Sequence, residues 1–451
     1  MTLTMTTARR RRFGYALSGV LAMSTAALLG MPLNGASAAS LPNNTEGVMC
    51  EQPDVDVSGN PTFNLDAKPG YISTPDGNSV YMWSYTATGR SFQLPGPTLC
   101  VGSGQTVTVI LHNTLREDTS IVFAGQTGVL ADGQPTQPQF SGTTMTSLVN
   151  VAAKAGGSVT YQFTAGSPGT YLYSSGTDVL KQKEMGLYGG LIVRPMSGSV
   201  LDTTHDGVGA GAKYSFDASR EYLYILSQID PDLHSAVEIN KTYNYNTSKA
   251  RYFFINGRSM PDTLAPNKAA WLPSQPYGSL IHIHSSEVQP ASALVRYLNA
   301  GTVNYPFHPH GSSQRVIVRD GVPVTDGAND ASYLKFLVDV GPGQSEDTLE
   351  TYTNEYDPAT KPIPSDIQLP QLQDQIVGPG AETWFPENPY LGAPGGANPV
   401  PNGTVQHNEC GEFYQVAHSH ALYQATNFGA SFGGMMTLIR IDPNPATTPC
   451  P

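Results

Sequence analysis

The sequence predicts an all-β protein made of two sandwich domains, and three observations support this fold class. Short alternating runs such as TVTVIL, EYLYIL and LIHIH recur between turn signals, as expected for strands with one buried face. Glycine (46 residues) and proline (36 residues) are frequent, and Tyr, Val and Thr are spread throughout the 451 residues. The chain also repeats itself at the length of a domain. Antiparallel Greek-key sandwiches fit all three observations.

Residues 1–38 are predicted to be a removable signal peptide. An arginine run at residues 9–12 precedes an apolar run over residues 15–31, and Ala36-Ser37-Ala38 is a small-residue cleavage site. The order Arg-Arg-Arg-Phe at residues 10–13 fits a twin-arginine signal, and a plain secretory signal is the alternative. We expect a protein exported to the periplasm or the extracellular space and cleaved near Ala38. No later stretch is apolar enough to span a bilayer.

The remaining chain is divided by composition into two domains. The first domain is predicted over residues 41–195 and the second over residues 214–451. A linker containing Gly and Ser joins them at residues 196–213. Within the second domain, residues 355–403 contain ten prolines and little apolar periodicity. We interpret that stretch as a long surface insertion, either a lid or an oligomer contact.

Charge and cysteine content limit the classes of partner. Without the four arginines of the signal, 20 basic and 36 acidic side chains remain, a net charge of −16, so nucleic acid is not expected as a partner. The four cysteines are Cys50, Cys100, Cys410 and Cys450. An even number in an oxidising compartment favours disulfides over metal thiolates, and three pairings are open.

The internal repeat sets histidines of the second half opposite other residues in the first half. Asn113–Gly125 and Asn299–Gly311 are equally long, share both end residues and follow similar strand-like runs. In this alignment Val122 and Ala124 correspond to His308 and His310, respectively. Counting back thirteen residues from Gly189 and from Gly433 places Ser174-Ser175-Gly176 opposite His418-Ser419-His420.

The two His-x-His pairs of the second half are the candidate metal ligands: His308, His310, His418 and His420. Residues i and i+2 of a strand point to the same face, so each pair presents two imidazoles side by side. If the two strands are neighbours, the four rings converge on one cavity. A set of imidazoles without sulfur favours Cu(II), with Zn(II) as the alternative, and we predict one or two ions. An isolated His-x-His pair, by contrast, is usually solvated or hydrogen-bonded and binds no metal.

Six motifs resemble those of the multicopper oxidases of the laccase type, which are built from cupredoxin domains. They occur in the order found in that family and span most of the chain after the signal, so the resemblance implies two cupredoxin-like domains. The motifs are Pro95-Gly96-Pro97-Thr98, Tyr171-Leu172-Tyr173, Met185-Gly186-Leu187-Tyr188-Gly189, Ile255-Asn256-Gly257-Arg258, Phe307-His308-Pro309-His310-Gly311 and His418-Ser419-His420.

This chain departs from the family at the copper positions. In the family, four His-x-His pairs from two domains hold a three-copper cluster that reduces oxygen, and a separate blue copper supplies the electrons. This chain keeps two of the four pairs. Ser419 stands where the blue site has Cys, and Gln424 and Tyr305 stand where it has His. Because a hydroxyl cannot replace the thiolate, the resemblance implies a halved cluster and no blue-copper relay. Met435 or Met436, near the axial methionine, is assigned to core packing.

Two functions from different classes remain. The first is an exported copper oxidoreductase. Its four-His site, which has fewer ligands than the cluster of the family, would act directly on oxygen, a small molecule or a metal ion. Ordinary laccase activity is not expected. The second is a non-catalytic cupredoxin-fold protein, a copper carrier or a metal-free scaffold. Two-domain members of the family are commonly trimers, which implies a homotrimer. The four histidines of one subunit would then face Val122, Ala124, Ser174 and Gly176 of the next.

The remaining histidines are expected outside the site. His282 and His284 form a third His-x-His pair that matches no ligand position of the family, and we predict a strand with Ile inward and His outward. Four further histidines are isolated and expected at the surface. They are His112, His205, His234 and His407.

Overall fold

The computed structural model describes most of the chain after residue 45. The described residues are 46–198, 200–202, 205–206, 214–284, 293–311, 313–327, 329–351, 376–377, 383–384, 413–430 and 433–442. They belong to one compact unit, Leu41–Pro451. The predicted signal peptide, His407, Cys410, Cys450 and nearly all of the predicted insertion lie outside the described residues.

The N-terminal half folds into a sandwich of two sheets. The larger sheet has the strand order β1-β2-β5-β11-β7-β8, with β3 added to β2, and the smaller has the order β4-β13-β12-β6. Strands of the larger sheet are β1 (Asp54–Val55), β2 (Pro61–Ser73), β3 (Ser79–Ala87), β5 (Thr106–Asn113), β7 (Leu130–Ala131), β8 (Gln134–Pro135) and β11 (Ser158–Thr164). Those of the smaller are β4 (Leu99–Gly102), β6 (Val122–Phe123), β12 (Gly169–Ser174) and β13 (Tyr188–Arg194).

The C-terminal half forms a second sandwich of the same kind. Its larger sheet has the order β19-β18-β21-β29-β23-β24, with β27 added to β23, and its smaller sheet has the order β20-β33-β32-β22-β28. Strands of the larger sheet are β18 (Glu221–Ile229), β19 (Tyr252–Ile255), β21 (Ala293–Asn299), β23 (Gln314–Arg319), β24 (Val322–Pro323), β27 (Tyr333–Lys335) and β29 (Ser345–Glu350). Those of the smaller are β20 (Ile281–His284), β22 (Tyr305–Pro309), β28 (Val338–Val340), β32 (Phe413–Ser419) and β33 (Met436–Asp442).

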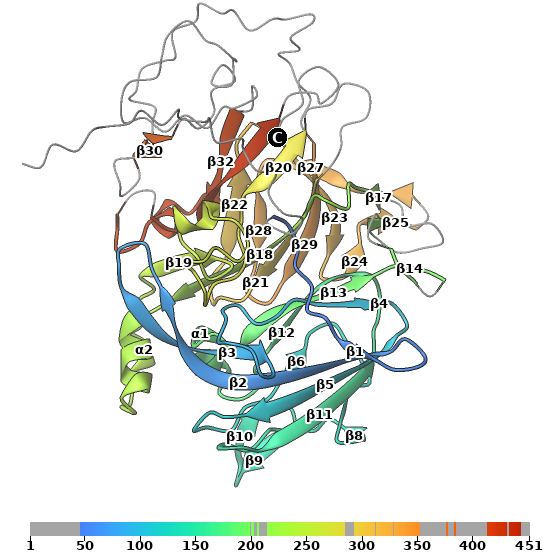
Figure 1. Ribbon diagram of the computed structural model, residues 1–451, viewed down its shortest axis with the longest axis vertical. Coiled ribbons are helices and arrows are strands. Elements are labelled where there is room, and N and C mark those ends of the chain that lie inside the picture. Colours follow the sequence, from blue (N-terminus) through green and yellow to red (C-terminus); the bar gives the residue numbers. More distant parts are fainter. Residues whose placement is uncertain are drawn as a thin grey trace, which may run out of the picture. The chain divides into compact units, whose positions relative to one another are not determined.

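The two sandwiches repeat the same strand pairings, and Figure 1 shows them as two blocks of strands, blue to green and yellow to red. β2 pairs in parallel with β5, and β18 with β21. β4 lies parallel to β13, and β20 to β33. β12 lies between β6 and β13, as β32 lies between β22 and β33. The predicted all-β class and the internal repeat are therefore confirmed.

Short hairpins and helices lie outside the main sheets of the two sandwiches. The hairpins pair β9 (Gln139–Ser141) with β10 (Thr144–Ser147), β14 (Met196–Ser197) with β15 (Val200–Leu201), β16 (His205–Asp206) with β17 (Tyr214–Ser215), β25 (Thr325–Asp326) with β26 (Asn329–Asp330), and β30 (Ile376–Val377) with β31 (Thr383–Trp384). The α-helices are α1 (Val179–Glu184) and α2 (Pro231–Glu238), and single 3-10 turns lie at Tyr245–Thr247, Asp262–Leu264 and Leu422–Ala425.

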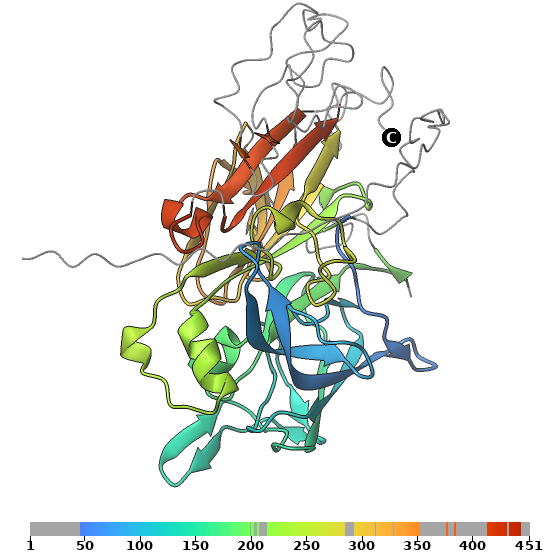
Figure 2. The ribbon, with the colours of Figure 1, turned by 60° about the vertical axis from the view of Figure 1, so that its left-hand side comes forward.

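Helix α2 packs on the first sandwich although it follows the first strand of the second. Asp230 caps the helix by accepting the N–H of Asp232, and Pro231 occupies the first turn. Leu233 and Val237 of α2 belong to the apolar core of the first sandwich, which also contains Trp83. Figure 2 shows the helix beside the blue strands. The helix therefore ties the start of the second half to the first sandwich.

The two sandwiches share buried contacts. Leu172 and Tyr188 of the first pack with Leu223, Ile225 and Leu298 of the second in one apolar cluster. Burying such side chains contributes about 1.5–3 kcal/mol each. No sheet among the described residues combines a strand before residue 195 with one after residue 214. The predicted domain limits at 195 and 214 remain predictions.

A buried ionic network crosses the same contact. The carboxylate of Glu221 accepts hydrogen bonds from Arg194 of β13 and from Arg296 Nε, the latter at 2.7 Å. Arg296 Nη1 also donates to Asp347 at 2.9 Å and to the hydroxyl of Thr170 on β12 at 3.0 Å. All five side chains are at most 5% exposed. The network fixes the two sandwiches by charge-assisted hydrogen bonds that water hardly screens.

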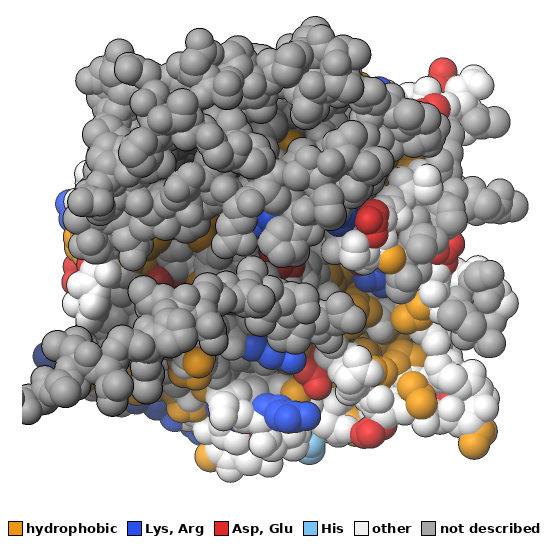
Figure 3. Space-filling view, turned by 45° about the horizontal axis from the view of Figure 1, so that its top comes forward, with side chains coloured by type: hydrophobic (Ala, Val, Ile, Leu, Met, Phe, Trp, Pro, Cys, Tyr) orange, Lys and Arg blue, Asp and Glu red, His pale blue; other side chains and the backbone are white. Residues whose placement is uncertain are grey.

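Three further features bear on the predictions. Cys50 and Cys100 form a disulfide, one of the pairings left open by the sequence. No helix in the described ranges is both long and apolar enough to cross a membrane. On the face in Figure 3, hydrophobic, acidic and basic side chains of the described residues are interspersed.

Candidate metal centre

The strands that carry the two His-x-His pairs are neighbours. β22 and β32 are antiparallel, and His308 lies directly opposite His418 in the register. His310 and His420 follow the ends of these strands. Their backbone N–H groups continue the pairing by donating to Val416 O at 2.8 Å and Pro306 O at 2.7 Å. The condition under which four imidazoles converge is therefore met.

The four rings lie on the same face of this strand pair. The centroid of the His308 ring is 4.7 Å from that of His310, 6.0 Å from that of His418 and 5.4 Å from that of His420. The His418 ring lies 5.0 Å from that of His310 and 6.0 Å from that of His420. His418 is buried, His308 and His310 are half-buried, and His420 is exposed. The cluster is therefore open to solvent on one side.

Hydrogen bonds at the Nδ1 atoms orient two of the rings. Because a carbonyl only accepts, His308 Nδ1 must donate to Phe336 O, and His418 Nδ1 must donate to Ser419 O at 2.8 Å. In a neutral imidazole the Nε2 lone pair then remains available, as a metal ligand requires. His418 Nε2 uses this lone pair to accept a hydrogen bond of 2.9 Å from His310 Nε2.

The environment keeps two of the histidines neutral. Burial lowers the pKa of His310 to about 4, with further lowering by the neighbouring rings of His418, His308 and His420. Burial also lowers the pKa of His418, and the same kind of repulsion from His308 and His420 adds to it. Neutral imidazoles are the form that binds metal ions, so the pair is ready to bind near pH 7 without releasing a proton.

The donor set fits copper, although it is not already arranged around an ion. No three His, Cys, Asp or Glu side chains within the described ranges are spaced to hold a metal ion as they stand. The 2.9 Å between His310 Nε2 and His418 Nε2 is nevertheless compatible with two imidazoles on one ion at metal–nitrogen distances of about 2.0–2.1 Å. Binding would replace the hydrogen bond between these nitrogens. It needs small ring movements and transfer of the His310 proton from Nε2 to Nδ1.

The residues at the blue-copper positions contact one another but cannot form such a centre. The hydroxyl of Ser419 donates to Gln424 Oε1, and Gln424 Nε2 donates to Asn304 O at 3.0 Å. Tyr305, at the third position, is fully buried. A hydroxyl, an amide and a phenol offer no thiolate and no imidazole, so this donor set does not fit blue copper. Met435 is buried in the apolar core, as expected.

The first sandwich contains the same arrangement, which the sequence reasoning missed. Ser175, the counterpart of Ser419, donates to Gln182 Oε1 at 2.7 Å, and Gln182 Nε2 donates to Asp118 O at 2.8 Å. Asp118 corresponds to Asn304, and Thr119, which corresponds to Tyr305, also donates to Gln182 Oε1 at 2.8 Å. Extending the repeat to Ser175 and the glutamine that follows it would have revealed this pair.

The histidine-free positions lie where the repeat predicted, with one correction. Ser174 is paired with Val122, as His418 is with His308. The alignment of Gly189 with Gly433, however, was wrong. Ser174 lies opposite Tyr188 and His418 opposite Met436, so Gly186 is the counterpart of Gly434. The loop before this glycine is four residues longer in the second half. The longer loop offset the wrong pairing of the glycines, so counting back thirteen residues still reached the equivalent positions.

Two other histidine predictions can be compared with the structure. Ile281 and Ile283 of β20 are buried, and His282 is half-buried with its Nδ1 3.2 Å from Glu46 Oε2, so this strand has the predicted orientation. The surface position expected for His234 was wrong. It is fully buried between α2 and β3, and its Nδ1 donates to Tyr81 O at 2.6 Å. His112 is half-buried on β5.

With this geometry in place, comparisons with known proteins define the class. Over 84% of its length the chain superposes on the blue copper oxidase from Nitrosomonas europaea, covering 85% of that chain, with a TM-score of 0.54 and 18% identity. The multicopper oxidase mgLAC gives a TM-score of 0.53 with 18% identity, covering 84% of this chain and 86% of that one. At this identity the likeness concerns the fold, and the chain is a protein of two cupredoxin-like domains.

Sequence comparisons show a resemblance to one family over part of the chain. Residues 75–198 match the family model described as multicopper oxidase. The L-ascorbate oxidase of Cucurbita maxima is 34% identical over 119 residues, which are 26% of this chain and 19% of that protein. Multicopper oxidase CTB12 of Cercospora beticola is 33% identical over 103 residues, 22% of this chain and 14% of that protein. The chain thus spans less than a fifth of these relatives. The resemblance to the multicopper oxidase family is confirmed, and the family-model match lies in the half without the four histidines.

Proposed function

We propose that this protein is an exported copper oxidoreductase whose copper is held by His308, His310, His418 and His420 and which has no blue-copper relay. The observation that carries the proposal is the convergence of four imidazoles on two neighbouring strands. Two of them, His308 and His418, have Nδ1 bonded to a carbonyl, and His418 Nε2 lies 2.9 Å from His310 Nε2. Bound there, one or two copper ions would supply a centre that exchanges electrons with a substrate; zinc is the alternative metal.

The residues around the cluster support direct access of a substrate. His420 is exposed and His308 is half-buried, so a small molecule or metal ion could reach the imidazoles from solvent. The Ser419–Gln424 hydrogen bond fills the place from which electrons would otherwise arrive through the protein. Substrate and oxygen must therefore meet at one site, in contrast to enzymes that separate the two by a relay.

A non-catalytic protein is the second candidate, and the hydrogen bond between His310 and His418 favours it. This bond holds the rings together without any ion. Filled blue-copper positions in both sandwiches are also compatible with a copper carrier or a scaffold. The two candidates differ in stoichiometric copper and in oxygen consumption.

We further propose that the subunits associate as a homotrimer, with this cluster at a subunit boundary. Phe336, whose carbonyl orients His308, is 63% exposed, and Leu422, two residues after His420, is 66% exposed. Exposed large apolar side chains beside a functional cluster are typical of a surface that another chain covers. Light scattering after size exclusion tests the association, and a Phe336→Ser/Leu422→Ser variant should be monomeric if the proposal holds.

The metal proposal is tested by copper analysis and electron paramagnetic resonance on wild-type protein, on His310→Ala and on His112→Ala as a matched control. We expect stoichiometric copper in the wild type and the control and its loss in His310→Ala. Copper retained by His310→Ala would exclude the proposed ligands. Oxygen uptake with phenols or oxidisable metal ions on copper-loaded protein then separates an oxidoreductase from a carrier.

A further inference from the structure

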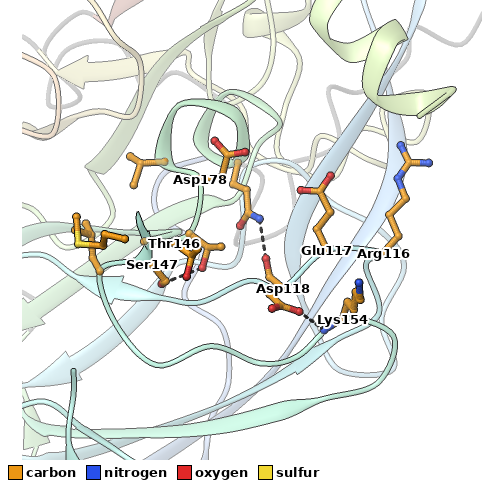
Figure 4. Close-up of a pocket in the computed structure, with 13 residues that line it drawn as sticks. Arg116, Glu117, Asp118, Thr146, Ser147, Lys154 and Asp178 are labelled. Carbon is orange, nitrogen blue, oxygen red and sulfur yellow. Dashed lines mark hydrogen bonds between the residues drawn. The ribbon is translucent and has the colours of Figure 1, made fainter. Parts of the chain in front are cut away.

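The first sandwich contains a hollow of about 570 Å³ that the proposed copper chemistry does not use. It lies between hairpin β9–β10, the start of α1 and the segment around Asp118 (Figure 4). This volume is in the range of small-molecule sites, about 300–1,000 Å³. The hollow is therefore large enough for an organic molecule of modest size.

The hollow reaches one of the four positions that correspond to the four-His cluster. Gly176, which lines it, corresponds to His420. A Cβ atom at Gly176 would lie only 2.7 Å from the Val122 side chain, so a histidine could not replace this glycine without movement of that side chain. The first sandwich thus offers at this place a hollow whose described lining contains no histidine.

The charges around the hollow leave two cations available. Lys181 forms ion pairs with Glu117 at 2.7 Å and Asp178 at 2.9 Å. Asp118 accepts the backbone N–H of Lys154 at 2.9 Å. Within the described residues, neither the guanidinium of Arg116 nor the ammonium of Lys154 forms an ion pair, and Arg116 donates only to the carbonyl of Glu238.

These two cations and the apolar side chains that line the hollow lie at different ends of it. Arg116 and Lys154 lie on one side of the hollow in Figure 4, and Thr146 and Ser147 on the other. Met145 and Leu148, which flank Thr146 and Ser147 in sequence, also line the hollow and are 50% and 44% exposed. One end of the hollow therefore contains Arg116 and Lys154 together with the carboxylates of Glu117 and Asp118, and the other end is partly apolar.

Hydroxyl groups lie beside the partly apolar end, and they bond to one another. Ser120 lies 3.2 Å from Ser147 Oγ and 2.9 Å from Thr177 Oγ1, and Thr177 donates to Ser147 at 3.0 Å. A closed ring of three hydroxyls uses all three protons within itself. These hydroxyls can accept hydrogen bonds, whereas Arg116 and Lys154 are the strong donors for an anionic group.

We propose that this hollow binds a small amphipathic carboxylate, an organic acid with an apolar ring or branched body. The carboxylate would lie against Arg116 and Lys154, and the apolar body against Met145 and Leu148. Because Asp118 remains close to Lys154, a second negative charge on the ligand would be repelled. A monocarboxylate is therefore favoured over a dicarboxylate, and binding requires no metal.

Calorimetric titration with benzoate as the probe tests the proposal on chelator-treated full-length protein. We expect saturable one-to-one binding, at least roughly tenfold weaker for the uncharged benzyl alcohol and for benzylamine, since a charge-assisted hydrogen bond contributes about 1.5–3 kcal/mol. Arg116→Gln/Lys154→Gln should weaken benzoate binding by the same factor. Arg90→Gln, which removes an exposed cation elsewhere, is the matched control and should leave it unchanged.

Two further variants decide where benzoate binds. Thr146→Trp fills the hollow from an exposed position and should abolish binding, whereas His310→Ala should leave it intact. Equal binding of benzylamine and benzoate would overturn the anionic preference. Loss of binding in His310→Ala, or no binding by the wild type at millimolar benzoate, would overturn the proposed site.

Discussion

Ser419 donates its hydroxyl proton to the side-chain oxygen of Gln424, and the Ser175–Gln182 pair in the first sandwich repeats this bond. In both places the glutamine amide also donates to a main-chain carbonyl, that of Asn304 or of Asp118. The same two residue types thus join the same strand and turn in each half. This recurrence indicates that the pair has a structural role of its own.

Gln424→Ala should lower the free energy of unfolding by about 2–3 kcal/mol, because it leaves the buried hydroxyl of Ser419 and the carbonyl of Asn304 without partners. Urea unfolding of Gln424→Ala, Ser419→Ala and the double variant measures the coupling between the two side chains. The double variant should lose less than the sum of the single variants. Additive losses would show that the hydrogen bond contributes nothing of its own.

The buried Glu221 should be among the most sensitive positions of the contact between the sandwiches. Glu221→Gln removes the charge that pairs with Arg194 and Arg296, and breaking a buried ion pair costs about 3–5 kcal/mol. Arg319→Ala is the comparison: it removes a cation that is 47% exposed from the buried Glu346, and it should cost less than Glu221→Gln. Thermal or urea unfolding of the two variants compares them, and similar losses would argue against the network.

His234 gives stability a pH dependence of known sign. Burial lowers its pKa to about 4, below the ordinary value of 6.5, so the unfolded chain binds the proton more readily. Its contribution is fully present above pH 6.5 and is lost as the pH falls toward 4, by up to about 3 kcal/mol. His234→Gln should flatten the unfolding free energy between pH 6.5 and 4. An unchanged slope would mean that the imidazole titrates normally.

Glu184 acts in the opposite direction. Burial raises its pKa to about 7, so the folded chain holds the proton more tightly than the unfolded chain does. This contribution is present below pH 4.5 and is lost as the pH rises through 7. In Glu184→Gln, stability should fall less between pH 4.5 and 7 than in the wild type, as urea titrations at several pH values can measure. A steeper fall in the variant would contradict the raised pKa.

The sequence was sufficient for the fold class and for bringing the four histidines together. Period-two alternation and two equally long segments, Asn113–Gly125 and Asn299–Gly311, contain that information locally. The loop before Gly434 was misjudged because a helix in one half and a 3-10 turn in the other connect equivalent strands. Such loops differ in length without disturbing the strands, so counting residues across them is unreliable.

Features that depend on contacts between distant segments could not be predicted from the sequence in this way. His234 lies in the short segment Pro231–Glu238, and only its packing on β3 buries it. The cations Arg116 and Lys154 are 38 positions apart and meet at one end of a hollow. No local pattern encodes such a meeting, because the sheet pairings decide it.

Substitution of Tyr305 tests the role of the side chain at one of the blue-copper positions. Its hydroxyl is buried and has no hydrogen-bond partner among the described residues. Tyr305→Phe should therefore leave stability unchanged or raise it by up to about 1–3 kcal/mol, the cost of an unsatisfied buried group. In Tyr173→Phe, the matched control, a hydroxyl that donates to Pro97 O at 2.6 Å is lost, and stability should fall by about 1 kcal/mol. A loss above 1 kcal/mol in Tyr305→Phe would show that a buried water satisfies the phenol.

Unchanged copper content and oxygen uptake in the same variant would assign Tyr305 to packing alone, whereas loss of oxygen uptake with copper retained would make it a hydrogen donor to the site.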